Sequence, residues 1–221
     1  MEFERIILEL QKNGNKRAVS TRKKIGMNTD KYLGVELKKI TDLAKKIGKN
    51  HKLAEQLRKS ELRDALLLSF FVDEPKKVSL NDAKNLLKLI DYPDLSDPFC
   101  SNIIINAPYI FDLIDEWKDS SKEMTKRCAY MGVCELAKNN HKVGDDYFLE
   151  FLSRIEREIG YSKNWVKDSM VCALNSIGER NEFLRNKTAS VIKNIGKVKI
   201  EFQKGTGVIA AQLKPLVGTA P

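Results

Sequence analysis

Apolar residues recur every three or four positions along most of the chain, which is the spacing of one face of an α-helix. Between residues 35 and 47 this apolar stripe faces a row of lysines, as expected for an amphipathic helix with a cationic outer face. Residues 62–72 are apolar on nearly every side and predict a helix inside the core. The main helices are expected at Lys16–Ile25, Leu62–Val72, Asp82–Ile90, Asp94–Ala107, Tyr109–Trp117, Ser120–Asn139, Asp145–Ile159, Trp165–Ile177 and Glu182–Ile195.

The connections between these segments are short and contain Pro, Gly or Asn at most junctions. About twelve helices joined in this way favour antiparallel neighbours, so we predict an all-α, HEAT-like helical-repeat solenoid. No constant repeat period is visible, and the prediction rests on the rhythm of the helices. We expect a single domain over residues 1–204 and a flexible C-terminal tail over residues 205–221.

The segment before this tail has a different pattern. Residues 198–202 alternate like a strand, and Gly205-x-Gly207-x-x-Ala210 fits a loose dinucleotide-binding pattern. That fingerprint requires a βαβ unit and an acidic residue about 20 positions further on, which the chain does not provide. We therefore reject a dinucleotide site and predict no cofactor.

The net charge of +9 is concentrated at one end of the chain. Residues 1–60 hold 16 Lys and Arg against 7 Asp and Glu, whereas residues 61–221 hold 23 of each. Such a distribution suits binding of a polyanion, because each neutralised phosphate releases counterions. The alternative is a solubilising lysine-rich surface. Five cations crowd one short predicted helix: Lys16, Arg17, Arg22, Lys23 and Lys24.

Composition argues against several other classes of protein. No apolar run approaches the ~20 residues of a membrane span, and residues 1–14 do not resemble a secretory signal, so we expect a cytoplasmic, non-membrane, monomeric protein. The four cysteines, Cys100, Cys128, Cys134 and Cys172, show no CxxC spacing, and the chain has only two histidines. We predict buried, reduced thiols and no metal site.

Residues 91–127 are the stretch in which we expect the chemistry. Asp91, Asp94 and Asp97 gather where a helix is expected to begin, and the segment ends in the pair Lys126-Arg127. A carboxylate near an arginine can serve chemistry on an anionic substrate. Each group also has a structural alternative, since Asp97 can be a helix N-cap and Arg127 can form an ion pair with a neighbouring helix.

Three stretches carry a resemblance to a known family: KKIG with LGVELKKITDLAKKIGKNHKLAEQL, DYPDLSD followed by a helix with Lys126-Arg127-x-Ala129, and NWVKDSMVCALNSIGERN. In this order and spacing, over about residues 16–195, the chain resembles the AlkD-type DNA alkylation repair proteins. Active members are HEAT-like solenoids that cut the N-glycosidic bond of alkylpurines without extruding the base. The resemblance implies DNA as the partner, whether duplex, alkylated or branched.

The same resemblance implies roles for individual residues. Asp97 matches the aspartate that stabilises the cationic sugar, and Arg127 matches the arginine that holds a backbone phosphate. The family's aromatic cleft residues fall on Pro93, on Cys172 and near residues 24–25, so they are missing here. Tyr92 and Trp117 are the candidate cleft walls, although Trp117 also fits a core position.

Three hypotheses about function remain open on these grounds. The first is DNA binding for repair, with glycosylase activity through Asp97 left open. The second is an active alkylpurine DNA glycosylase in which Tyr92 forms a wall of the cleft. The third is a non-catalytic scaffold for branched DNA or protein partners. The candidate nucleic-acid-binding residues are Arg127, Lys126, Lys16, Arg17, Arg22, Lys23, Lys24, Lys167 and Arg180.

Overall fold

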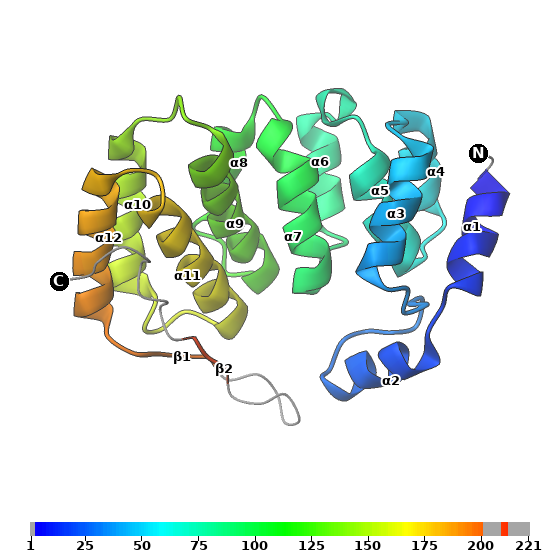
Figure 1. Ribbon diagram of the computed structural model, residues 1–221, viewed down its shortest axis with the longest axis horizontal. Helices are drawn as coiled ribbons and strands as arrows, with labels where there is room; N and C mark the ends of the chain where they lie inside the picture. Colours follow the sequence, from blue (N-terminus) through cyan, green and yellow to red (C-terminus); the bar gives the residue numbers. More distant parts are fainter. Residues whose placement is uncertain (1–2, 201–208, 212–221) are drawn as a thin grey trace. The chain divides into compact units, whose positions relative to one another are not determined.

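The computed structural model describes residues 3–200 and 209–211, and nearly all regular structure within them is helical (Figure 1). The prediction of an all-α protein with about twelve helices is confirmed for these residues. The helices are α1 (Phe3–Lys12), α2 (Lys16–Lys24), α3 (Leu37–Ile47), α4 (His51–Lys59), α5 (Arg63–Val72), α6 (Leu80–Leu87), α7 (Pro93–Asn102), α8 (Ile110–Trp117), α9 (Glu123–Asn139), α10 (Asp145–Glu158), α11 (Asn164–Gly178) and α12 (Glu182–Ile195), with 3-10 turns η1 (Pro75–Lys77) and η2 (Ile104–Asn106).

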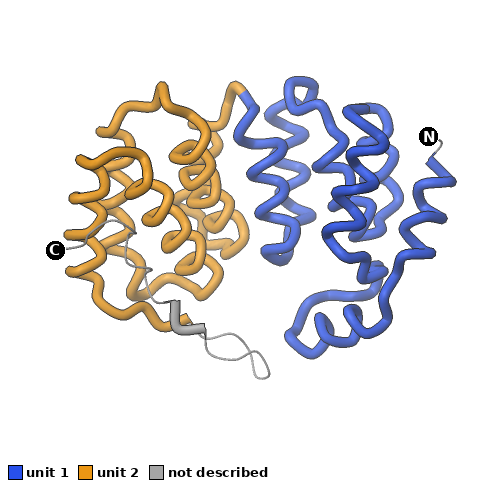
Figure 2. Tube along the Cα trace, viewed as in Figure 1, with its two compact units in different colours: residues 1–107, 203–206 blue, residues 108–202, 207–221 orange. Residues whose placement is uncertain are grey.

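Packing divides the chain into two compact units (Figure 2). The first, unit 1, contains α1 to α7, and the second, unit 2, contains α8 to α12 and a short β-hairpin. The organisation as one domain over residues 1–204 stays a prediction.

The core of unit 1 is built around α5. Eight of its ten residues are buried, which agrees with its apolar sequence on all sides, and it packs against α3, α4 and α7. Buried apolar surface contributes about 25 cal/mol for each Å², so burial of α5 stabilises its packing with the helices around it.

The core of unit 2 is built around α9, which packs mainly against α11 and also against α8. A glycine in the middle of α9, Gly132, lets α8 come close: a methyl group at this position would lie 3.0 Å from Cγ1 of Ile114. This glycine therefore has a packing role inside a helix, where glycine is otherwise unfavourable.

Gly132→Ala is expected to lower the free energy of unfolding by about 1–3 kcal/mol, because the added methyl group overpacks the contact with Ile114. Chemical denaturation measures the change. Gly160→Ala is the matched control, since its methyl group meets no atom within 4 Å. A Gly132→Ala protein as stable as the control would contradict the packing role.

The helix predicted over 94–107 differs most from the structure. The sequence predicted a helix over 94–107, but α7 ends at Asn102 and the chain continues as the 3-10 turn η2. Ala107 is extended, with ψ near 136°, because it precedes Pro108, and a residue before proline is driven away from the helical region.

The segment with the alternating pattern contains β1 (Val198–Ile200), which pairs antiparallel with β2 (Ile209–Ala211). Val198 faces Ala211 in this pairing, and Ile200 faces Ile209. Strand β2 lies within residues 205–221, where a flexible tail without a strand was predicted. The other residues of that tail lie outside the described residues. Among residues 3–200 and 209–211, no helix is long and apolar enough to cross a membrane.

Candidate nucleic-acid interface

Helix α2 in unit 1 carries the densest group of cations in its half of the chain. Its N-cap is Asn15, whose Oδ1 accepts hydrogen bonds from the backbone N–H groups of Arg17 and Ala18 at 3.0 and 3.2 Å. None of its nine residues is buried. Four cations of the helix are exposed to solvent: Lys16, Arg17, Lys23 and Lys24.

The segment after α2 fixes the helix to the rest of unit 1. The N–H of Asn15 donates to the carbonyl of Leu33 at 2.8 Å, and the buried carboxylate of Asp64 accepts from the N–H groups of Leu33 and Val35 at 2.7 and 2.8 Å. Burial raises the pKa of Asp64, and these two hydrogen bonds oppose the shift. Gly34 has a φ of +78°, and a methyl group there would lie 2.6 Å from the carbonyl oxygen of Asn15, so only glycine fits.

Arg22 is half-buried, unlike the other cations of α2, and its guanidinium lies near two tyrosines. Its guanidinium is 6.0 Å from the ring centroid of Tyr92 and close enough to the hydroxyls of Tyr92 and Tyr32 to affect their ionisation. Burial raises the pKa of both phenols, and the nearby Arg22 lowers it in part. The structure therefore brings two predicted residues, Arg22 and Tyr92, together and adds Tyr32. We refer to α2 with Arg22, Tyr32 and Tyr92 as the basic–tyrosine surface.

The three predicted carboxylates do not form one cluster. Arg63, the first residue of α5, donates from Nη1 to Asp91 at 2.6 Å and from Nε to Asp94 at 3.1 Å. Asp97 instead accepts a hydrogen bond from the hydroxyl of Ser96 at 2.7 Å. Arg63 thus binds two of the three carboxylates, and Asp97 is half-buried.

Asp97 does not begin its helix. α7 starts at Pro93 and its N-cap is Tyr92, so Asp97 lies in the second turn and the N-cap alternative is wrong. Proline at the first helical position suits the helix because that residue's N–H would have no helical partner. The role of Asp97 in catalysis stays a prediction.

Arg127 in unit 2 forms the ion pair that the sequence left open as an alternative. Its side chain is 2% exposed, and Nη1 donates to Asp168 at 2.6 Å and to the carbonyl of Trp165 at 2.8 Å. The guanidinium also lies 5.9 Å from the ring of Trp165, and Glu123 accepts from the N–H of Trp165 at 2.9 Å. Arg127 therefore joins α9 to α11, and its role in binding a phosphate stays a prediction.

The other predicted residues of unit 2 also have partners inside the unit. Lys126 pairs with Glu158 at 2.7 Å. Arg180 donates to the carbonyls at the end of α9, including Ala137 at 2.9 Å, and acts as a helix cap. Lys167 is half-buried, with Nζ 3.5 Å from the carbonyl of Lys199. Trp117 is 2% exposed, so it belongs to the core and not to a cleft wall.

No group of three or more His, Cys, Asp and Glu side chains in the described part of the chain could hold a metal ion. The four cysteines are free thiols. Three of them are buried, whereas Cys172 is half-buried, which corrects the prediction that all four are buried.

Sequence reasoning missed three residues that shape these sites: Tyr32, Arg63 and Asp168. Arg63 pairs with residues 28 and 31 positions further along the chain, and Asp168 pairs with a residue 41 positions before it. Tyr32 follows the polar turn after α2 and carries no helical pattern of its own. For Asp168, the one available signal was its position as an acidic residue on the polar side of the helix predicted over 165–177.

The helices define an all-α protein with a HEAT-like repeat fold. A solved structure aligns with a TM-score of 0.84 over 95% of this chain and 90% of that chain, with 22% sequence identity. That structure is described under the words "A new family of proteins related to the HEAT-like repeat DNA glycosylases with affinity for branched DNA structures". The predicted HEAT-like fold class is confirmed.

The family follows from the sequence itself. A family model described as DNA alkylation repair enzyme matches residues 6–188, so the chain belongs to the DNA alkylation repair family. No protein with a curated description matches the chain.

Proposed function

We propose that this protein binds DNA through the basic–tyrosine surface of unit 1. The observation that carries the proposal is α2, a helix with four exposed cations and no acidic residue, held rigidly beside Tyr32 and Tyr92. Cations on a fixed helix suit the regular spacing of phosphates in a strand, and each neutralised phosphate releases counterions. Tyrosine rings add sequence-independent stacking with exposed bases.

Branched DNA is the form of DNA that we propose as the preferred partner. The solved structure with the same fold is described as having affinity for branched DNA structures, and two half-buried tyrosines beside a basic helix suit the unstacked bases of a branch point. A cytoplasmic location and a monomeric state stay predictions.

A salt titration tests the proposal. The logarithm of the association constant for a fluorescent duplex or four-way junction is expected to fall linearly with the logarithm of salt, with a slope of about −0.9 for each neutralised phosphate. The four exposed cations of α2 then give a slope of roughly −3 to −4. Binding that is undetectable at low salt contradicts the proposal, and salt-independent capture of a protein partner favours a scaffold instead.

Alkylpurine glycosylase activity is the second candidate, and Asp97 supports it. Its carboxylate is half-buried and accepts a hydrogen bond from the fully buried Ser96, so it is held in place five residues after Tyr92. A fixed carboxylate beside a developing sugar cation is the electrostatic device used in glycoside hydrolysis. The missing aromatic residues of the family weigh against this candidate, which is why DNA binding comes first.

Release of methylated purines from alkylated duplex DNA tests the second candidate. If the protein is active, Asp97→Asn is expected to bring base release down to the spontaneous rate, because the charge that stabilises the sugar cation is removed. DNA affinity should stay equal or rise slightly, since the variant carries one negative charge fewer. Base release that survives the substitution contradicts the role of Asp97, and binding without release by the unmodified protein leaves DNA binding as the function.

A further inference from the structure

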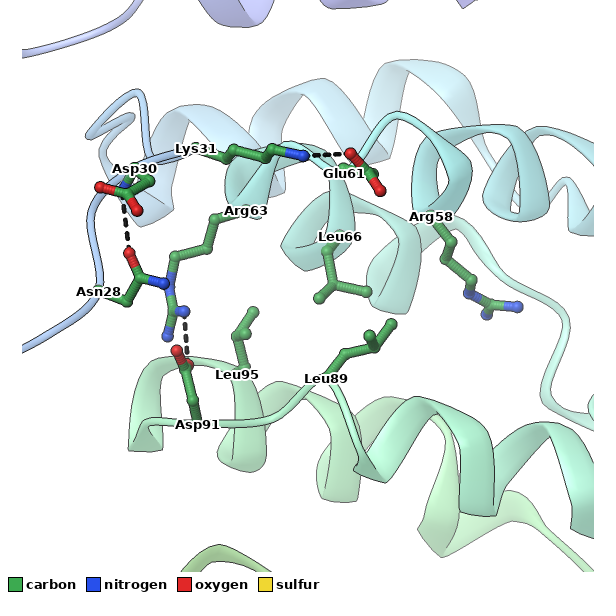
Figure 3. A pocket seen from close by; sticks show the side chains of 10 residues that line it. All are labelled: Asn28, Asp30, Lys31, Arg58, Glu61, Arg63, Leu66, Leu89, Asp91 and Leu95. Atoms are coloured by element: carbon green, nitrogen blue, oxygen red, sulfur yellow. Dashed lines mark hydrogen bonds and ion pairs between the residues drawn. The ribbon is translucent and has the colours of Figure 1, made fainter.

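Unit 1 contains a cavity of about 360 Å³ whose lining comes from the segment after α2, from α4, α5 and α7, and from the connections before α5 and α7 (Figure 3). This volume lies within the range of about 300–1,000 Å³ found for small-molecule sites. The cavity is lined by Asn28, Asp30, Lys31, Arg58, Glu61, Arg63, Leu66, Leu89, Asp91 and Leu95.

We infer that this cavity receives an unpaired nucleobase from DNA held on α2. The inference rests on the proposed DNA binding and adds a recognition site to it. Three properties of the cavity support it: a lining without net charge, an apolar centre, and a position next to the basic helix.

The lining has no net charge, and all three of its cations are paired with carboxylates, Arg58 with Asp73 outside the lining. Three cations and three carboxylates contribute to it. Lys31 pairs with Glu61, and Arg63 pairs with Asp91 (Figure 3). A phosphate would have to compete with these carboxylates for the cations, so a neutral ligand suits the cavity better. The bases of DNA are neutral at pH 7.

The centre of the cavity is apolar, and its edge offers both hydrogen-bond donors and acceptors. Leu66, Leu89 and Leu95 lie between the charged side chains (Figure 3). Leu89 is 50% exposed, so part of this apolar lining is accessible to a ligand. Carboxylates accept from the amino groups of adenine, cytosine and guanine, whereas thymine has no amino group. The lining therefore fits a flat base that carries an amino group.

The position of the cavity connects it to the proposed DNA surface. Asn28 lies four residues after Lys24, the last residue of α2, so its Cα atom lies at most about 14 Å from that of Lys24. Lys31 precedes Tyr32, and Asp91 precedes Tyr92, so the two tyrosines near Arg22 adjoin the lining in sequence. A strand whose phosphates lie on α2 can thus place an unpaired base at the cavity.

The experiment compares three DNAs that differ at one position: a duplex with one bulged adenine, the same bulge with an abasic analogue, and the fully paired duplex. The unmodified protein is expected to bind the adenine bulge about tenfold more tightly than the abasic bulge, the size expected for one well-placed base. The abasic DNA keeps every phosphate, so the comparison isolates the base.

Leu89→Trp fills the cavity from a half-exposed position and is expected to abolish this tenfold preference while leaving affinity for the paired duplex unchanged. Leu37→Trp is the matched control, because Leu37 lies in the same unit, is 54% exposed and does not line the cavity. This control is expected to keep the preference.

Equal binding of the adenine and abasic bulges by the unmodified protein overturns the inference, whatever the variants do. The melting temperature shows whether the Leu89→Trp protein is folded. If the folded variant still prefers the adenine bulge, the preference comes from another site, and the inference is overturned. No binding to any of the three DNAs at low salt overturns the proposed function itself.

Discussion

Neutralising the four exposed cations of α2 is expected to lower affinity for duplex DNA on the order of 10²-fold at about 0.1 M salt, because each phosphate contact contributes several-fold at that salt concentration. The salt dependence should weaken at the same time, by about 0.9 in slope for each phosphate that is no longer neutralised. The variant carries Lys16→Ala, Arg17→Ala, Lys23→Ala and Lys24→Ala. None of these residues is buried, and alanine is a better helix former than either replaced residue, so the fold should be kept.

A second variant separates a specific surface from the general effect of net charge. Helix α3 lies in the same unit and carries four exposed lysines on one face. Replacing these with alanine changes the net charge by the same amount, and affinity is expected to stay within a few-fold of the unmodified protein. The four are Lys38, Lys39, Lys45 and Lys46. Equal decreases in affinity in the α2 and α3 variants would mean that the protein attracts DNA through its overall charge, which contradicts the basic–tyrosine surface.

The helices could be predicted from the sequence because their apolar stripes and capping residues are local signals. α12 begins and ends where the pattern predicted, at Glu182 and Ile195, since Asn181 caps its start and Gly196 follows its end. The largest difference between the predicted and observed helices is in the segment after α7. The helical spacing of apolar residues continues past Asn102, and the constraint that Pro108 places on the residue before it changes the backbone.

The sites were harder to predict because their partners are far apart in the sequence. The basic character of α2 is a local property and was visible. In contrast, the sequence could not show that Arg63 would donate hydrogen bonds to both Asp91 and Asp94. Each such pairing depends on how helices that lie about 30 residues apart pack together.

Arg127 shows the same difficulty most clearly, and Arg127→Met tests which role this residue has. The resemblance to alkylation repair proteins predicts a phosphate contact, whereas the structure buries the guanidinium against Asp168 and Trp165. Breaking a buried ion pair costs about 3–5 kcal/mol. Asp168 is 36% exposed and can be hydrated after the substitution, so we expect the free energy of unfolding to fall by about 3 kcal/mol, at the lower end of this range.

Chemical denaturation and a salt titration of DNA binding, both on the same Arg127→Met protein, distinguish the two roles. A structural arginine predicts lower stability, with the affinity of the folded protein and its salt slope unchanged. A phosphate-binding arginine predicts a slope weaker by about 1, with weaker binding at every sequence alike. Arg157→Met is the matched control, since Arg157 is exposed on α10 in the same unit, and its stability should change by no more than about 0.5 kcal/mol. A weaker slope in Arg127→Met with the stability of the control would mean that the pair with Asp168 opens when DNA binds, and that the aspartate holds the place of a phosphate in the free protein.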